Sequence, residues 1–182
     1  MTNILLISED KVKENSNLND NFYGKNLRNP IREAQDIGLQ SVLGTCLYNH
    51  ILDLVKTNEI QDSGNTAYKD LLVNYAQDYL LYLVLSNLVL TANVKLANIG
   101  SVITNDEHIV NLSQSEAELL RRNYEEKANF YRRRLQSFLC QNYEAYPELE
   151  QCECECGCSI IKPDLKSSES SGIWLGGLMY KK

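Results

Sequence analysis

No stretch of the chain without Asp, Glu, Lys or Arg is longer than the one between Asp78 and Lys95, and this stretch constrains the fold more than any other feature. It contains polar residues such as Ser86 and is shorter than the roughly 20 mostly apolar residues that a membrane-spanning helix needs. The stretch therefore predicts a helix buried inside a protein. The surrounding pattern extends this helix over residues 66–98, and Gly100 is expected to end it.

The apolar side chains of this predicted helix wrap most of the way round it. A helix that is apolar on all sides is a central one, covered by neighbours in several directions. Other subunits are candidates for some of these neighbours, and Tyr79 and Tyr82 are expected to contact them. The chain carries 11 tyrosines, and a tyrosine ring has an apolar body and a polar tip that suit surfaces buried on assembly.

Two shorter helical pieces are predicted over residues 29–57. Asn29 is a good N-cap, and Pro30 suits the first position of a helix. Gly38 is expected to end the first piece, and Gly44 interrupts the next. An apolar stripe at helical spacing then follows, made of Leu47, Ile51, Leu54 and Val55.

The last strong helix is predicted to begin at Ser113 or Ser115, since each serine fits a capping box with the glutamate three residues later. Pro147 marks its end. Charged side chains on one face form pairs four residues apart, Arg121–Glu125 and Glu118–Arg122. The other face carries an apolar stripe of Leu120, Tyr124, Ala128, Tyr131, Leu135 and Phe138.

These elements predict a mainly α fold, a small helical bundle with a long central helix and extended terminal arms. A short β-hairpin or an extended loop is expected near residues 100–112, where Val102-Ile103 would pair with Ile109-Val110.

Three regions follow from this pattern. Residues 1–28 form an N-terminal arm, in which Ser8 is expected to cap a short helix through Asn15. Residues 29–147 form the helical domain. Residues 148–182 form an extended Cys-rich C-terminal tail.

The charge and the first residues of the chain exclude several classes of protein. The net charge is -6 and the pI about 5.0, so a strong electrostatic grip on nucleic acid is not expected. The chain begins without a basic segment before its short apolar run, so no secretory signal is expected, and a disulfide framework is the less favoured interpretation of its cysteines.

Four cysteines lie in one short stretch of the tail: Cys152, Cys154, Cys156 and Cys158. Four thiolates can hold a tetrahedral zinc ion, but single-residue spacing is tighter than that of usual zinc sites. Zinc is therefore one hypothesis. A reduced acidic segment and thiols oxidised to disulfides are the others. If zinc or redox chemistry is what the tail does, the chain would be a metal-binding or redox-responsive regulatory module.

No catalytic residue is predicted, and the chain is not expected to be an enzyme. The sequence has no Gly-rich phosphate loop and no nucleophile-elbow motif. The triplet Arg132-Arg133-Arg134 lies on a helix with Glu125 and Glu126, so a solvated or subunit-facing surface is favoured over a phosphate site.

A set of short motifs carries a resemblance. Residues 29–35 read Asn-Pro-Ile-Arg-Glu-Ala-Gln, residues 43–48 read Leu-Gly-Thr-Cys-Leu-Tyr, and Asn98 and Gly100 stand in a loop between the long apolar helix and the Tyr-rich one. In this order the chain resembles the head–tail connector proteins of tailed bacteriophages, and it looks closest to the ring proteins of crAss-like phages. The resemblance covers residues 25–147.

The resemblance implies an α-helical adaptor with a small β element and no cofactor. It implies a ring of about twelve copies, between the portal protein and the tail, in the neck of the virion after assembly in the host cytoplasm. DNA would pass through the lumen without sequence-specific binding, and other neck or tail proteins would be partners. No membrane is implied. The tail lies outside the family pattern, but its closing apolar residues, Trp174, Leu175, Leu178 and Met179, are candidates for a subunit or partner contact.

Overall fold

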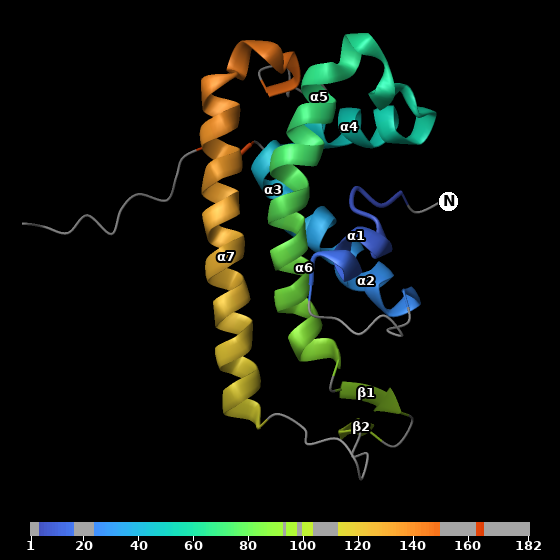
Figure 1. Ribbon diagram of the computed structural model, residues 1–182, viewed down its shortest axis with the longest axis vertical. Helices are drawn as coiled ribbons and strands as arrows, with labels where there is room; N and C mark the ends of the chain where they lie inside the picture. Colours follow the sequence, from blue (N-terminus) through green and yellow to red (C-terminus); the bar gives the residue numbers. More distant parts are fainter. Residues whose placement is uncertain are drawn as a thin grey trace, which may run out of the picture.

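The computed structural model describes residues 4–16, 24–92, 94–97, 100–103, 113–149 and 163–165 (Figure 1). This part of the chain is mainly α, a small helical bundle, as the sequence predicts. The α-helices are α1 (Glu9–Glu14), α2 (Lys25–Glu33), α3 (Gln40–Leu43), α4 (Thr45–Thr57), α5 (Thr66–Leu71), α6 (Gln77–Ala92) and α7 (Gln114–Gln141). Two π-helical segments (Ala34–Leu39 and Leu72–Ala76), short 3-10 turns and the strands β1 (Val94–Ala97) and β2 (Gly100–Ile103) complete the described elements.

The central helix consists of α5, the π-helical segment Leu72–Ala76 and α6, which follow one another without a break. It has α7 on one side and α1, α2 and the π-helical segment Ala34–Leu39 on the other (Figure 1). From Leu71 to Leu88 most of its apolar side chains are buried by elements of the same chain, although Val73 is 40% exposed. The buried apolar residues are Leu71, Leu72, Ala76, Tyr79, Leu80, Leu81, Val84, Leu85 and Leu88.

The central helix ends earlier than predicted. It stops at Ala92 instead of continuing to residue 98, and residues 94–97 form β1. Strand β1 pairs with β2 in antiparallel register, from Val94 opposite Ile103 to Ala97 opposite Gly100. Gly100 therefore begins a strand and does not cap a helix. The predicted partner strand at Ile109-Val110 lies outside the described residues.

The first described residues belong to the core, which differs from the predicted arm over residues 1–28. Ser8 caps α1 as expected, with its hydroxyl accepting from the Lys11 backbone N–H. Leu6, Ile7 and Val12, however, are almost fully buried. Burying three large apolar side chains is worth several kcal/mol, enough to fix a segment that is polar at most other positions.

Gln35 fastens this N-terminal segment to the bundle. Its side chain is 3% exposed. Its Oε1 accepts from the Leu6 backbone N–H at 3.1 Å, and its Nε2 donates to the Ile4 carbonyl at 3.0 Å. The amide thus satisfies one backbone donor and one backbone acceptor that have no strand or helix partner.

We expect Gln35→Leu to lower the free energy of unfolding by about 1–3 kcal/mol, because it leaves the Leu6 N–H and the Ile4 carbonyl without partners. Urea denaturation followed by circular dichroism measures the change. Gln61→Leu makes the same substitution at an exposed position and should leave the urea concentration at half unfolding nearly unchanged. Equal effects of the two variants would contradict the role of Gln35.

Two predicted boundaries before the central helix were wrong. Helix α2 begins at Lys25 and contains Pro30 in its interior, so Asn29 is not an N-cap. The earlier start brings Leu27, which is fully buried, onto the same face as Ile31 one turn later. The gain in apolar burial outweighs the backbone hydrogen bond that Pro30 cannot donate.

Gly38 lies inside the π-helical segment Ala34–Leu39 and does not end a helix. A Cβ atom at this position would lie 2.2 Å from Leu83 Cδ2 and 3.2 Å from the Tyr79 hydroxyl. The glycine therefore permits close approach of the central helix. The predicted break at Gly44 is confirmed: this residue has φ 76°, ends α3 and precedes α4.

Helix α7 begins where the sequence predicts. Ser113 is its N-cap and forms the capping box with Glu116, with both reciprocal hydrogen bonds present. The stripe is buried at Ala128 and Leu135, whereas Leu120 is 37% exposed. The first half of α7 thus buries little in the described part of the chain.

The fold also extends past the predicted end of the helical domain. Tyr146 is buried and donates its hydroxyl to the Ala67 carbonyl at 3.0 Å. Leu149 is only 5% exposed. Glu148 accepts a hydrogen bond from the Tyr68 hydroxyl at 2.8 Å. The first two residues assigned to the tail, Glu148 and Leu149, therefore close one end of the bundle.

Candidate functional site

A row of half-buried aromatic rings lines the junction of α6 and α7, including the π-helical turn before α6. Tyr75 stacks on Phe138 with ring centroids 3.9 Å apart, and Tyr82 stacks on Tyr131 at 5.2 Å. These two pairs show that α6 and α7 run antiparallel. Each stacked pair contributes about 0.5–1.5 kcal/mol beyond its buried area. We call Tyr75, Tyr82, Tyr124, Tyr131 and Phe138 the aromatic seam.

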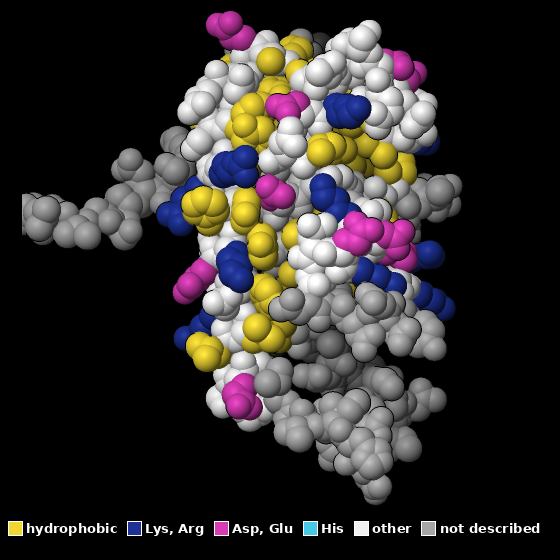
Figure 2. Space-filling model, in the orientation of Figure 1, with side chains coloured by type: hydrophobic (Ala, Val, Ile, Leu, Met, Phe, Trp, Pro, Cys, Tyr) yellow, Lys and Arg dark blue, Asp and Glu magenta, His cyan; other side chains and the backbone are white. Residues whose placement is uncertain are grey.

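Cations lie over the rings of the aromatic seam. Lys127 Nζ is 5.7 Å from the centroid of Tyr82 and 5.6 Å from that of Tyr124. The Arg134 guanidinium lies 4.9 Å from the centroid of Tyr75, and its Nη1 is 3.4 Å from the Asp78 carboxylate. Figure 2 shows the result, a band of hydrophobic side chains along the helix pair with charged groups between them.

Two large apolar side chains stand on the outer side of α7. Leu119 is 71% exposed and Phe130 is 58% exposed. They are eleven positions apart, about three helical turns, so they lie on the same line of the helix. The buried Ala128 and Leu135 lie on the opposite side. We call Leu119 and Phe130 the outer apolar positions.

The charges on the first half of α7 pair with one another. Arg121 pairs with both Glu118 and Glu125, and Arg122 lies 3.3 Å from Glu118, which confirms the predicted pairs. The hydrogen bond from Arg121 holds the pKa of Glu118 at about 2, far below its usual range. Because these charges are satisfied within the helix, the outer apolar positions are the features of this surface that gain most from a partner.

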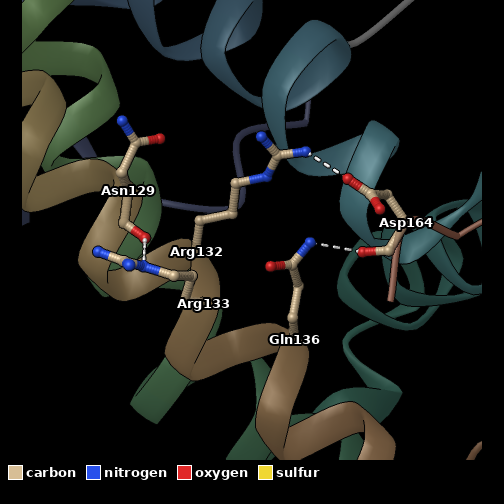
Figure 3. A pocket seen from close by; sticks show the side chains of 5 residues that line it. All are labelled: Asn129, Arg132, Arg133, Gln136 and Asp164. Atoms are coloured by element: carbon tan, nitrogen blue, oxygen red, sulfur yellow. Dashed lines mark hydrogen bonds and ion pairs between the residues drawn. The ribbon is translucent and has the colours of Figure 1, made fainter. Parts of the chain in front are cut away.

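The segment Pro163–Leu165 returns to the bundle and binds between α3 and α7 (Figure 3). Asp164 Oδ2 accepts from Arg132 Nη2 at 2.7 Å, and the Asp164 carbonyl accepts from Gln136 Nε2 at 2.6 Å. The Asp164 N–H donates to the Ser41 carbonyl at 3.2 Å. A polar pocket of about 280 Å³ opens beside these groups, lined by Asn129, Arg132, Arg133, Gln136 and Asp164.

The arginine triplet thus has partners inside the chain that sequence reasoning missed. Arg132 binds Asp164, and Arg134 binds Asp78. Arg133 is exposed and donates from Nε to the Asn129 carbonyl at 3.3 Å. The sequence carries no signal for the contact between Arg132 and Asp164, because two residues 32 positions apart form no periodic pattern.

The structure separates the two tyrosines that were expected to contact other subunits. Tyr79 is 5% exposed, and its burial raises the pKa of its hydroxyl. It packs inside the bundle near Gly38 and is not a surface residue. Tyr82 is half-buried in the aromatic seam and remains a candidate for contact.

The other predicted site residues lie outside the described residues. These are the possible zinc ligands Cys152, Cys154, Cys156 and Cys158 and the apolar residues Trp174, Leu175, Leu178 and Met179. Within the part of the chain that the structure describes, no group of three or more His, Cys, Asp or Glu could hold a metal ion. Zinc at the tail cysteines stays a prediction.

A second aromatic cluster joins α4 and α5 to the turns after α7. The ring centroid of Tyr68 lies 4.8 Å from that of His50 and 5.6 Å from that of Tyr146. Burial and the hydrogen bond to Glu148 raise the pKa of Tyr68 to about 12. Burial also raises the pKa of Tyr146.

We expect the protein to lose stability between about pH 10 and pH 12. The folded state holds the Tyr68 proton more tightly than the unfolded chain, whose tyrosine pKa is about 10. The contribution is fully present below pH 10 and is lost as the pH rises towards 12. Urea midpoints measured from pH 8 to pH 12 test this, and Tyr68→Phe should make the slope shallower while the raised pKa of Tyr146 preserves part of it. A slope in the variant equal to that of the wild type would contradict the assignment.

The described chain is therefore a helical bundle with a half-buried aromatic seam between α6 and α7 and two outer apolar positions on α7. By sequence it belongs to DUF6712, a family of unknown function, whose pattern matches residues 39–159. No curated protein and no solved structure matches the chain significantly. Among the described helices, none has the length and apolar character needed to cross a membrane.

Proposed function

We propose that the chain is a structural protein of a phage virion that forms a ring in the neck, joins the portal to the tail and lines the DNA channel. The observation that carries the proposal is the outer side of α7, where Leu119 and Phe130 are 71% and 58% exposed on one line of the helix. Two such residues aligned on a helix whose first half carries paired charges favour burial against another protein.

Contact through α7 also agrees with the resemblance to connector proteins, which covers the residues from α2 to the turn after α7. A ring needs each copy to present one surface to the next, so that the same contact repeats around an axis. The long, straight α7 offers a surface of this kind. The copies of this chain, the portal protein and other neck or tail proteins are the proposed partners.

The charge of the chain fits a conduit for DNA. A net charge of -6 does not favour tight binding of phosphates, and a channel that held DNA tightly would slow its passage. The proposed action is mechanical, a joint and a seal without turnover, and its proposed place is the virion.

Two measurements on the full chain test the proposal. Native mass spectrometry and electron microscopy of the purified protein, alone and with its neck partners, should find closed rings. Mass spectrometry of purified virions should find the chain in a fixed ratio to the portal protein. A strictly monomeric protein that is absent from the particles would overturn the proposal.

A further inference from the structure

Cys46, in the first turn of α4, is disulfide-bonded, and its partner follows by elimination. The chain has six cysteines, and Cys140 on α7 is free. The partner is therefore in the tail cluster, which we define as Cys152, Cys154, Cys156 and Cys158. The sequence alone made a disulfide the less favoured interpretation of these residues, and the bond at Cys46 corrects that expectation.

The described residues on both sides of the tail cluster lie against the region where α4 begins. Before the cluster, the Glu148 carboxylate lies 3.6 Å from Nε2 of His50, which is one helical turn after Cys46. After it, the Asp164 N–H donates to the carbonyl of Ser41 in α3, which a single glycine separates from α4. The first cysteine of the cluster follows Glu148 by four residues, which span up to about 14 Å. The cluster can therefore reach Cys46 while both contacts stay in place.

A bond from Cys46 to the tail cluster closes a covalent loop around most of the helical domain. The loop contains nearly all of α4, the central helix and α7. It is about 110 residues long, and a cross-link over such a distance strongly limits the conformations of the unfolded chain. The bond therefore stabilises the folded state against unfolding.

The position of Cys46 also suits reversible chemistry. The residue is half-buried, so it is not sealed inside the core. The first turn of a helix stabilises a negative charge, and a thiolate is the group that attacks when a disulfide forms and leaves when it is reduced.

A small-molecule disulfide can supply the oxidant. The Cys46 thiolate attacks one of its sulfurs and expels a thiolate, and a thiolate of the tail cluster then attacks the Cys46 sulfur and expels the second. The protein gives up two electrons and two protons, and the small disulfide becomes two thiols. An excess of small thiol reverses both steps.

We propose that the disulfide between Cys46 and the tail cluster is a redox-controlled cross-link of the helical domain. The reduced chain folds without the bond, and oxidation raises its resistance to unfolding. The bond leaves three cysteines of the cluster, so it excludes a zinc ion held by all four thiolates. The inference goes beyond the proposed function and holds whether or not copies of the chain form a ring.

Peptide mapping of the full-length chain locates the bond. The chain is equilibrated with oxidised glutathione, alkylated with iodoacetamide in denaturant without reductant, digested and analysed by mass spectrometry. In chains with the intact mass of a single copy, we expect the Cys46 peptide to be linked to the tail cluster and Cys140 to be alkylated. An alkylated Cys46, or a link between Cys46 and Cys140, would overturn the proposal.

Thermal unfolding followed by circular dichroism measures the effect of the bond. The melting temperature of the oxidised chain should be about 10 °C or more above that of the reduced chain. Cys46→Ser should abolish this difference. Cys140→Ser makes the same substitution at the free cysteine and should preserve it. Equal melting temperatures of the oxidised and reduced wild type, or a difference that persists in Cys46→Ser, would contradict the stabilising role.

Reduction of the native chain tests the redox control. In excess reduced glutathione, without denaturant, the bond should open while the helical circular dichroism signal is kept. Excess oxidised glutathione should then restore both the bond and the higher melting temperature. A bond that opens only after the chain is unfolded, or a reduced chain that loses its helices, would overturn the redox control.

Discussion

Leu135→Ala is expected to lower the free energy of unfolding by about 2–5 kcal/mol. Leu135 is fully buried, on the side of α7 that packs against the central helix. The substitution removes apolar contacts and leaves a cavity that the surrounding helices fill only in part. Because the free energy of unfolding of small proteins is only about 5–15 kcal/mol, the substitution removes a large share of it. Urea denaturation with two spectroscopic probes measures the change.

Leu119→Ala is the matched control for this core substitution. It is the same chemical change on the same helix, at a side chain that is 71% exposed. The expected effect on stability is within about 0.5 kcal/mol of zero, because little area is lost and alanine is a good helix former. If both leucines had the same effect, the assignment of an inner and an outer side to α7 would be wrong.

Phe130→Glu is expected to prevent ring formation while leaving the fold of the single chain intact. Burying a phenylalanine side chain is worth about 1.5–3 kcal/mol. That corresponds to about a 10- to 150-fold change in the dissociation constant. A glutamate in its place would also bring an unpaired charge into the contact. Sedimentation or light scattering over a range of concentrations measures assembly, and thermal unfolding checks the fold.

Ile37→Glu provides the comparison for assembly. Ile37 is 69% exposed but lies in the π-helical segment Ala34–Leu39, on a different element. The Ile37 variant should assemble like the wild type. Assembly that is lost with Ile37→Glu and kept with Phe130→Glu would move the contact surface from α7 to the π-helical segment.

Local features of the sequence predicted much of the fold, because the interactions that fix them lie within a few residues. The capping box at Ser113 joins residues three apart, and the break at Gly44 depends on one backbone angle. The buried stretch after Asp78 was recognisable because so long a run without charge has few alternatives to a buried helix.

The errors have a common cause, since packing between distant segments overrode the local signals. Proline and glycine are common near helix ends, yet Pro30 and Gly38 both lie inside helical segments here. The burial of Leu27 favours the earlier start of α2, and the close approach of Leu83 favours glycine at position 38. Neither contact can be predicted from the residues next to it in the sequence.

The candidate site was predicted less well than the fold. The aromatic residues of α7 were expected to form an apolar stripe, but their stacking partners on the central helix depend on how two helices align. Gln35 and Asp164 were not recognised at all. Each is a polar residue whose role comes from backbone groups far away in the chain.

The π-helical turn at Leu72–Ala76 bears on how this helix can change in evolution. Such a turn holds one residue more than regular winding would, so every side chain after it is rotated by about 100° relative to those before it. Tyr68, which lies before the turn and contacts His50 of α4, and the residues after the turn that pack on α7 are thus set in phase by a single amino acid. Substitutions can accumulate in the helix one at a time, but the gain or loss of one residue there would turn half of its length away from its neighbours. Homologous chains should therefore differ in side chains along this helix while keeping its length.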